Sequence, residues 1–224
     1  MPHQTKVTMP STTADHRPRR MAPEDRKQAL IVSALELFSR DSPERVSMED
    51  VAEHAGVSRA LVYRYFSNIE EIHVAALRSA VDVLVARLTR TREGDLLTQL
   101  QDTIGEFVTF AEEHAAGYIA LLRSGSVIAT SETSTLVDEV RHVAVQEVLN
   151  RLDIAEPTPF MLLTLRCWIA VCEGAILTWL QERTLAKDEL VPWLSGQLVA
   201  MLTATAGHDP AVAAFIAALA GEDH

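Results

Sequence analysis

The chain has 224 residues, of which 48% are hydrophobic, 23% are charged and only 5% are aromatic, and its formal net charge is −11. This length and composition suffice for a buried core in one large domain or two small ones. They argue against a strand-rich protein, because the valines lie at helical spacing among Ala, Leu and Glu. We therefore expect an all-α fold.

Several features bear on the compartment of the protein. Residues 160–180 are apolar but contain Arg166 and Glu173, so no uninterrupted apolar segment reaches membrane-spanning length. Residues 1–23 lack the apolar stretch of a secretory signal. Cys167 and Cys172 lie five apart on a predicted helix, where they point in different directions and cannot pair with each other. We expect a cytoplasmic protein without a membrane partner.

The charge is distributed unevenly along the chain. Residues 1–66 hold ten basic and nine acidic side chains, whereas residues 67–224 hold ten and twenty-two. A nearly neutral amino-terminal part can approach a polyanion that would repel the acidic remainder. The alternative is that surface charge is merely uneven, so the asymmetry alone favours nucleic acid only modestly.

The first predicted elements are an arm and a helix. Residues 1–22 are polar and without periodicity, which predicts a disordered basic arm ending in the sequence HRPRR. Pro23 is suited to the first turn of a helix, and the apolar residues that follow recur at spacings of three and four. The pattern predicts a helix over 24–40.

Two short helices follow around a glycine. Ser47 with Asp50 is an N-cap pattern that predicts a helix through MEDVAEHA, residues 48–55. Gly56 permits the positive φ of a tight turn. Ser58 then caps a third helix over 59–65. This arrangement is a helix-turn-helix, whose second short helix can enter the DNA major groove.

The rest of the chain predicts a larger helical region. Asn68 with Glu71 is another cap pattern, and a long helix follows to about Arg92. Further helices are predicted near 95–114, 116–124, 132–152, 159–183, 189–206 and 210–220. We expect the arm at 1–22, a three-helix DNA-binding domain at 23–67 and a larger ligand-binding and dimerisation domain at 68–224.

Helical geometry assigns roles to the residues of the third helix. With Val62 toward the core, Ala60 and Arg64 point directly away from it, and Leu61 and Tyr63 flank them. Arginine can pair with guanine or phosphate, and tyrosine can offer a hydroxyl to phosphate. The competing interpretation is that the tyrosines only pack and the serines only cap their helices.

The stretch SMEDVAEHAGVSRALVYRYFSNIEEI, residues 47–72, closely resembles the DNA-binding signature of the TetR family of transcription regulators. The resemblance implies phosphate contacts from Ser47, Ser58, Tyr63 and Tyr65, and positions near base edges for Arg59, Ala60 and Leu61. We add Arg64 from its outward position. The chain departs from the family at Ile69, where a phosphate-contacting lysine is usual, and at Leu61, where a small or hydroxyl residue is usual.

The same resemblance gives the arm a hypothetical role. Family members with basic amino-terminal extensions can lay them in the adjacent minor groove, and Arg17, Arg19 and Arg20 precede the first helix by only a few residues. The alternative is a solvated tail that adds only non-specific attraction.

The resemblance also implies a homodimer through the last two long helices. Residues 159–181 are apolar nearly all round, which requires cover on more than one side. Gly174, Ala170 and Ala175 permit close helix approach, and a second apolar surface is expected from Leu194, Leu198, Val199 and Met201. The alternative is a helix fully buried within its own subunit.

In this family the middle helices enclose a small-molecule cavity. We expect its apolar lining, and hence its ligand, to be largely hydrophobic. Glu173, in mid-helix, is either a pocket group or the partner of Arg166 or Arg123. The candidate ligand-binding residues are Phe107, Phe110, Tyr118, Leu122, Arg123, His142, Trp168, Cys172 and Glu173.

The sequence thus predicts a DNA-binding transcription regulator, a repressor released from a palindromic operator by a small apolar ligand, with no metal and no cofactor. The alternative is a dimeric DNA-binding regulator that responds to no ligand. An enzyme is disfavoured, because the sequence has no G-x-S-x-G, no Gly-rich phosphate loop and no HxxxH or CxxC pattern.

Overall fold

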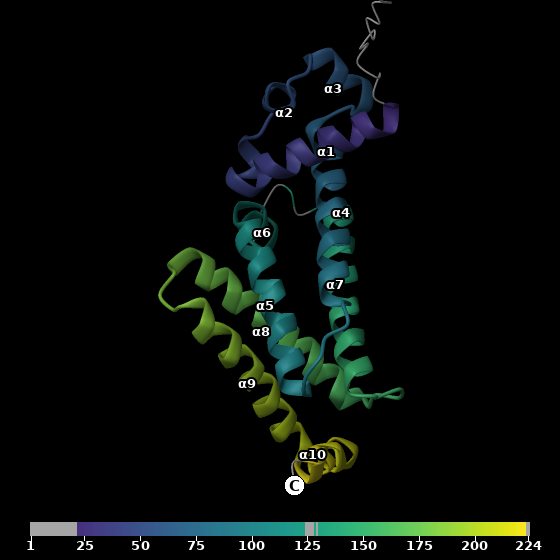
Figure 1. Cartoon of the computed structure of the whole chain (residues 1–224), viewed down its shortest axis with the longest axis vertical. Coiled ribbons are helices and arrows are strands. Elements are labelled where there is room, and N and C mark those ends of the chain that lie inside the picture. The colour runs from purple at the N-terminus through teal and green to yellow at the C-terminus, as the bar shows by residue number, and fades with distance from the viewer. Residues whose placement is uncertain (1–21, 124–127, 129, 223–224) are drawn as a thin grey trace, which may run out of the picture.

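A computed structural model describes residues 22–123, 128 and 130–222 (Figure 1). The described residues form helices without a strand, which confirms the all-α prediction. The expected arm with Arg17, Arg19 and Arg20 lies outside them, apart from Ala22. The elements are α1 Pro23–Arg40, the 3-10 turn η1 Pro43–Arg45, α2 Met48–His54, α3 Arg59–Tyr65, α4 Ile69–Leu88, α5 Leu96–Glu113, α6 Ala115–Leu122, α7 Ser131–Arg151, α8 Pro159–Glu182, α9 Lys187–Ala206 and α10 Pro210–Glu222.

Helices α1 to α3 form a head at one end of an elongated molecule (Figure 1). The head has its own core, in which Leu30 and Phe38 of α1 meet Val51 of α2 and Val62 of α3. Phe66, just after α3, is also buried there, and the Lys27 ammonium lies 5.7 Å from the centre of its ring. This packing fixes the orientation of α3, since Val62 is fully buried and the opposite side of the helix must face outward.

The turn between α2 and α3 follows the prediction from its glycine. Gly56 has a φ of 63°, a left-handed conformation that costs other residues more. The predicted N-cap of α2 is also confirmed: Ser47 Oγ accepts from the Asp50 N–H, and Asp50 Oδ2 accepts from the Ser47 N–H. Helix α2 therefore begins where its cap signal places it, and α3 spans the predicted residues 59–65.

Helix α4 connects the head to the remaining helices and ends at Leu88, four residues before the predicted end. Two arginine side chains explain the stop. The guanidinium of Arg92 donates to the carbonyls of Leu88 and Arg87, and that of Arg151, at the end of α7, also donates to the Leu88 carbonyl. Carbonyls at a helix end need such donors, and these side chains supply them from outside the helix.

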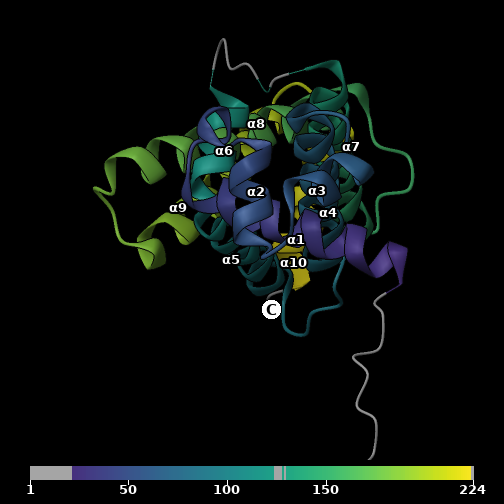
Figure 2. The same ribbon diagram turned by 90° about the horizontal axis from the view of Figure 1, so that it is seen from above.

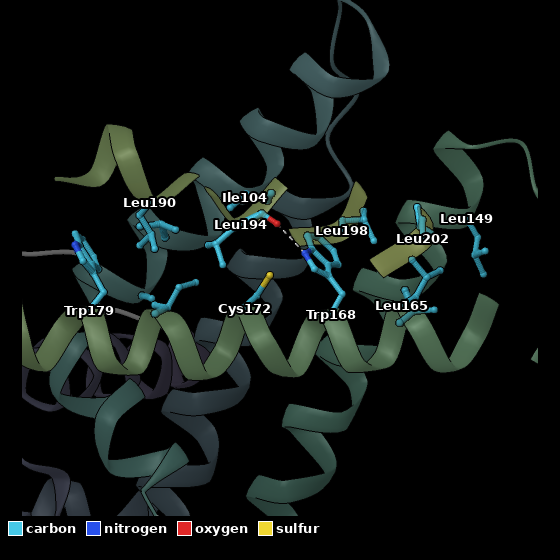
Figure 3. Packing of buried hydrophobic residues seen from close by; sticks show 14 of the residues in the cluster. Ile104, Leu149, Leu165, Trp168, Cys172, Trp179, Leu190, Leu194, Leu198 and Leu202 are labelled. Carbon is cyan, nitrogen blue, oxygen red and sulfur yellow. Dashed lines mark hydrogen bonds between the residues drawn. The ribbon is translucent and has the colours of Figure 1, made fainter. Parts of the chain in front are cut away.

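The body comprises α4 to α10, and its main core lies along α8. One face of α8 packs on α5 and α9 through Leu165, Trp168, Cys172 and Ile176 (Figure 3). The indole N–H of Trp168 donates to the Leu194 carbonyl over 2.9 Å, which fixes α9 against α8. These four residues of α8 thus stabilise the body through its core.

Leu194 and Leu198 of α9 belong to this same core and are almost completely buried. The expectation that they contribute to a second exposed apolar surface was therefore wrong. The hydrophobic pattern of α9 marks two faces rather than one, and the inner face is the one that carries these leucines. Val199, one position further along the helix than Leu198, is on the exposed side.

The outer sides of α8 and α9 expose large apolar side chains. They include Leu163, with 58% of its surface exposed, and Val199, with 54%, together with Phe160, Val171 and Trp193. By length and composition alone, α8 is the one described helix that could cross a membrane, with a mean hydropathy of 1.8. Its inner face is occupied by the protein core, so a bilayer is not needed to account for its composition.

The head sits on α4 and α6 of the body through α1. Ser39 of α1 contacts His114 at the start of α6, with 2.7 Å between Oγ and Nδ1. A Cβ added to Gly117 of α6 would lie 3.4 Å from the Phe38 carbonyl oxygen, which shows how closely α6 approaches α1. A change in the body that moves α4 or α6 would therefore be passed to the head.

Candidate nucleic-acid interface

The outward side of α3 combines small, cationic and phenolic residues. Ala60 and Arg64 are exposed, and Tyr63 has 45% of its surface exposed. In the view from above, α2 and α3 lie at the end of the molecule that faces the viewer (Figure 2). An exposed Ala60 leaves room for the backbone to approach a groove floor, while the longer side chains around it can reach bases or phosphates.

Arg59 is exposed at the start of α3 and is held by two neighbours. Its Nη2 lies 2.5 Å from Oε1 of Glu49 on α2, and its guanidinium carbon lies 5.5 Å from the centre of the Tyr63 ring. A hydrogen bond with Tyr63, and then the charge of Glu49, raise the pKa of the Arg59 guanidinium. The arginine is thus charged and pre-positioned at the rim of the surface, but it must leave Glu49 to pair with a base or phosphate.

The two serines predicted to contact phosphate differ in their local bonds. Ser47 is engaged in the N-cap of α2, and its hydroxyl donates to Asp50 over 2.6 Å. This bond lowers the pKa of the Asp50 carboxyl. Ser58 precedes α3 but makes no side-chain capping bond, contrary to the expectation that it caps this helix. Its exposed hydroxyl is consequently available to an incoming phosphate oxygen.

The remaining predicted DNA contacts lie nearer the core. Leu61 and Tyr65 are half-buried, and the ring of Tyr65 packs against the core of the head. Ile69, a departure from the signature at residues 47–72, also packs against this core. These residues lie at the border of the outward surface. Only the outer edge of the Tyr65 side chain is therefore placed to contact DNA.

Sequence reasoning missed Glu49. It lies in the first turn of α2, ten residues before Arg59, and only the crossing of α2 and α3 brings the two together. The hint in the sequence was Glu49 itself, an acidic residue in the first turn of the first short helix to which no prediction gave a role. Because this carboxylate faces the same surface as Arg59, it adds a negative charge where a polyanion would dock.

The predicted ligand-binding residues do not converge on one hollow. Phe110 and Tyr118 line a hollow of about 100 Å³ beside α1 and α4, whereas His142 and Glu173 line a groove of about 740 Å³ between α7 and α8. Leu122 is half-buried and Arg123 is exposed. Phe107 packs against the body core and meets Tyr118 edge to face, with 6.1 Å between ring centres.

Trp168 and Cys172 point into the α8–α9 core (Figure 3). Burial raises the pKa of the Cys172 thiol to about 12, so it stays protonated at neutral pH. Neither residue lines either of these two hollows. Across the described residues, no group of three or more His, Cys, Asp or Glu side chains is placed to hold a metal ion.

Glu173 forms an ion pair, but with a partner other than the predicted Arg166 or Arg123. Both of its carboxylate oxygens accept from the guanidinium of Arg141 on α7, over 2.9 and 2.8 Å. This pairing raises the pKa of Arg141. The Tyr118 hydroxyl donates to the Glu173 carbonyl over 3.3 Å, and burial raises the pKa of that phenol. Glu173 therefore links α6, α7 and α8 at one rim of the groove.

A three-helix head with a glycine turn and an outward Arg/Tyr surface on its third helix defines a helix-turn-helix protein. Comparisons with known proteins identify the family. The family model described as bacterial regulatory proteins, tetR family, matches residues 30–76, and the model for the tetracyclin repressor-like C-terminal domain matches residues 96–201. A tetR-family transcriptional regulator from Streptomyces coelicolor is 37% identical, with a TM-score of 0.86, over 90% of each chain. The chain belongs to the TetR family.

Curated relatives include regulators of both signs. The transcriptional activator FasR of Mycolicibacterium smegmatis is 29% identical over 46% of this chain and 48% of its own length. The transcriptional repressor KstR of Rhodococcus jostii is 24% identical over 75% of this chain and 78% of its own length. The chain thus spans about half the length of FasR and more of KstR.

Proposed function

We propose that the chain is a sequence-specific DNA-binding transcription regulator that acts as a dimeric repressor and is released from its operator by a small apolar ligand. The observation that carries this proposal is the outward surface of α3. Its charged and phenolic side chains are not used by the core of the head, and they lie beyond a glycine turn on a helix fixed by the buried Val62. Such a helix fits the major groove.

Two copies of α3 are needed, because one helix reads only a few base pairs. The exposed apolar sides of α8 and α9 support such a dimer, because large exposed apolar patches usually mark an interface. The side chains exposed there include Leu163, Val171, Trp193 and Val199. Gly174 and Gly196 are exposed on the same helices and permit close helix approach. A symmetric pairing through these helices would set two recognition helices at a fixed spacing.

Ligand control needs a hollow in the body and a path to the head. The groove between α7 and α8 has the volume of a small-molecule site, and the joint of α1 with α4 and α6 connects the body to the head. A ligand that favours one arrangement of this joint would change the spacing of the two α3 helices. A coupling free energy of about 1–3 kcal/mol would lower operator affinity about 5- to 150-fold.

Selection of bound duplexes from random DNA tests the proposal. We expect a palindrome whose half-sites lie about 10–10.5 base pairs apart or a multiple of that spacing. Recovery of no enriched sequence at low ionic strength would contradict the function. A protein with this target is expected in the cytoplasm, because that is where it would reach its operator DNA.

A promoter-reporter carrying the selected operator then gives the sign of regulation. Loss of reporter expression on adding the regulator supports repression, and a gain would establish activation instead. Adding candidate apolar ligands to the DNA complex tests the release step. Failure of a broad screen to displace the protein would favour the ligand-independent alternative.

A further inference from the structure

Helix α8 carries three rows of side chains that face three different neighbours. Trp168 and Cys172 rise on the side that packs on α9 (Figure 3). Val171 lies on the exposed outer side, and Ala170, one position earlier, lines the groove of about 740 Å³ between α7 and α8. Because successive residues are turned by about 100° around a helix, the groove and the outer side are adjacent and form one continuous surface.

The groove has an apolar floor. Val145 and Leu149 of α7 are buried in it, and Leu162 and Ile169 of α8 are half-buried. Its volume is larger than that of an indole ring. An apolar hollow that continues into an exposed apolar side of the protein is suited to a large side chain brought by a partner.

A cation at the rim of the groove has no counterpart in its own subunit. Arg166 is exposed and lines the groove, and it forms no ion pair with any residue that the structure describes. The two carboxylates of the lining, Asp138 and Glu173, both pair with Arg141. A free guanidinium beside an apolar hollow can stack on an aromatic ring or pair with a carboxylate.

Helix α9 offers an aromatic ring and a carboxylate together. Trp193 has 49% of its surface exposed on the outer side of α9, and the exposed Glu189 lies four residues earlier on the same side. Glu189 uses Oε2 to accept from the Ala186 N–H, which leaves Oε1 for another donor. Trp193 does not line the groove of its own subunit, because α9 packs on the side of α8 that carries Trp168.

A two-fold pairing places this side of α9 beside the groove of the other subunit. When α8 and α9 of two copies form a four-helix bundle, each α8 has its own α9 on one side and the partner's α9 on the other. The second of these sides is the outer side of α8, which continues into the groove.

We propose that the partner subunit's Trp193 seats in the groove between α7 and α8, with Arg166 against its ring and within reach of the partner subunit's Glu189. This contact rests on the dimer of the proposed function, and it makes each groove a site that both subunits build. A groove of about 740 Å³ is larger than one indole ring, so a small ligand still fits beside it.

Mixed dimers test the contact directly. One set of subunits carries a nitroxide on Glu156→Cys, an exposed position beside the groove, in a Cys167→Ser background that removes the exposed cysteine. The other set carries 5-fluorotryptophan and no nitroxide. We expect the Trp193 fluorine resonance, assigned with Trp193→Phe, to broaden in the mixed dimers. The same nitroxide on Glu53→Cys of the head should leave it sharp.

Sedimentation of the same samples separates two kinds of failure. A dimer whose Trp193 resonance stays sharp with the Glu156→Cys label overturns the contact and leaves the dimeric regulator standing. A chain that stays monomeric at micromolar concentration overturns both the contact and the dimer on which it rests.

Dimer dissociation constants then test the role of the two side chains. Trp193→Ala should weaken dimerisation by about 30-fold or more, as loss of a buried aromatic anchor does, whereas Leu97→Ala, which removes a similarly exposed side chain on α5, should leave it unchanged. Arg166→Gln should also weaken the dimer, and its effect should not add to that of Trp193→Ala, because each removes the same contact. Fully additive losses would overturn the seating of the indole against Arg166.

Discussion

Helices α3 and α8 each bury one side in their own core and turn the other to solvent, but the two exposed sides have opposite chemistry. The outer side of α3 presents Arg59, Tyr63 and Arg64, whereas that of α8 presents Phe160, Leu163 and Val171. Neither side is needed by the core behind it. The difference supports the partner proposed for each: a polyanion for the first, and a second apolar helix face for the second.

On both helices, the side chains that stabilise the subunit are distinct from those proposed to bind a partner. Val62 of α3 and Leu165 of α8 are fully buried, and each lies within three residues of an exposed residue assigned to binding. Substitutions on the inner side should change the free energy of unfolding. Those on the outer side should change assembly or DNA affinity.

The largest effect is expected from neighbouring leucines of α8. Leu165→Ala removes a fully buried side chain and should lower the free energy of unfolding by about 2–5 kcal/mol. Leu163→Ala removes an exposed one, so it should weaken dimerisation while leaving the stability of the monomer nearly unchanged. Chemical denaturation and sedimentation measure the two effects. Equal losses of stability in both variants would contradict the assignment of α8's outer side to a partner.

The next effect concerns base recognition. Arg59→Ala should reduce operator affinity about 5- to 150-fold and relax the preference at one base pair. Tyr63→Ala should weaken all duplexes nearly uniformly, because a phosphate contact carries no sequence information. Arg78→Ala, which removes an exposed arginine paired with Glu139 on the body, is the matched control. Fluorescence anisotropy with operator and scrambled duplexes gives the comparison, and an unaltered Arg59→Ala variant would remove that residue from the interface.

The two serines of the head should respond differently. Ser47→Ala removes the N-cap of α2 and should cost about 0.5–2 kcal/mol of stability. Ser58→Ala removes no capping bond, so thermal unfolding should change little while operator affinity falls. Melting curves and DNA titrations on both variants check this. A large loss of stability in Ser58→Ala would show that its hydroxyl supports the fold rather than the contact.

A smaller effect of opposite sign is expected at Glu49. Glu49→Gln removes a negative charge from the DNA-facing surface and frees Arg59, so affinity for any duplex should rise, by up to about fivefold at low salt. Glu53→Gln on the same helix is the charge-matched control. If both variants gain affinity equally, the effect is one of net charge, and the Arg59–Glu49 pair does not compete with DNA.

The smallest effect is a pH dependence at the joint. Burial lowers the pKa of His73 below its ordinary value of 6.5, so the unfolded chain binds the proton more readily than the folded one. Stability from this group should be complete above about pH 6.5 and fall as the pH drops below it. His114 shifts in the same direction for the same reason. Denaturation between pH 5 and 7.5 should show this slope, and His73→Phe should reduce it.

The sequence predicted the helices and the glycine turn because these depend on local signals. Pro23, Ser47 and Asn68 stand at or next to the observed helix starts, and Gly56 adopts the positive φ expected of it. The resemblance at residues 47–72 placed the candidate DNA surface on a helix that the fold does expose. These parts of the account needed no knowledge of the tertiary structure.

The partners of individual side chains could not be predicted in the same way. The pairing of Glu173 with Arg141 rather than Arg166 depends on how α7 crosses α8, and that of Arg59 with Glu49 depends on how α2 crosses α3. The inward orientation of Leu194 arises because the apolar pattern of α9 has two sides. Cavity lining is likewise a property of crossing helices, so most of the predicted ligand residues were divided between two hollows and the core, while Leu122 and Arg123 lie in neither.

Methylation of guanine N7 by dimethyl sulfate on a selected operator tests the central claim most directly, because this atom lies in the major groove. The account predicts two clusters of protected guanines, with centres about 10–10.5 base pairs apart or a multiple of that spacing. At least one protection in each cluster should disappear with Arg59→Ala. A bound operator whose N7 atoms stay fully reactive, or a single protected cluster, would contradict the docking of paired α3 helices in the major groove.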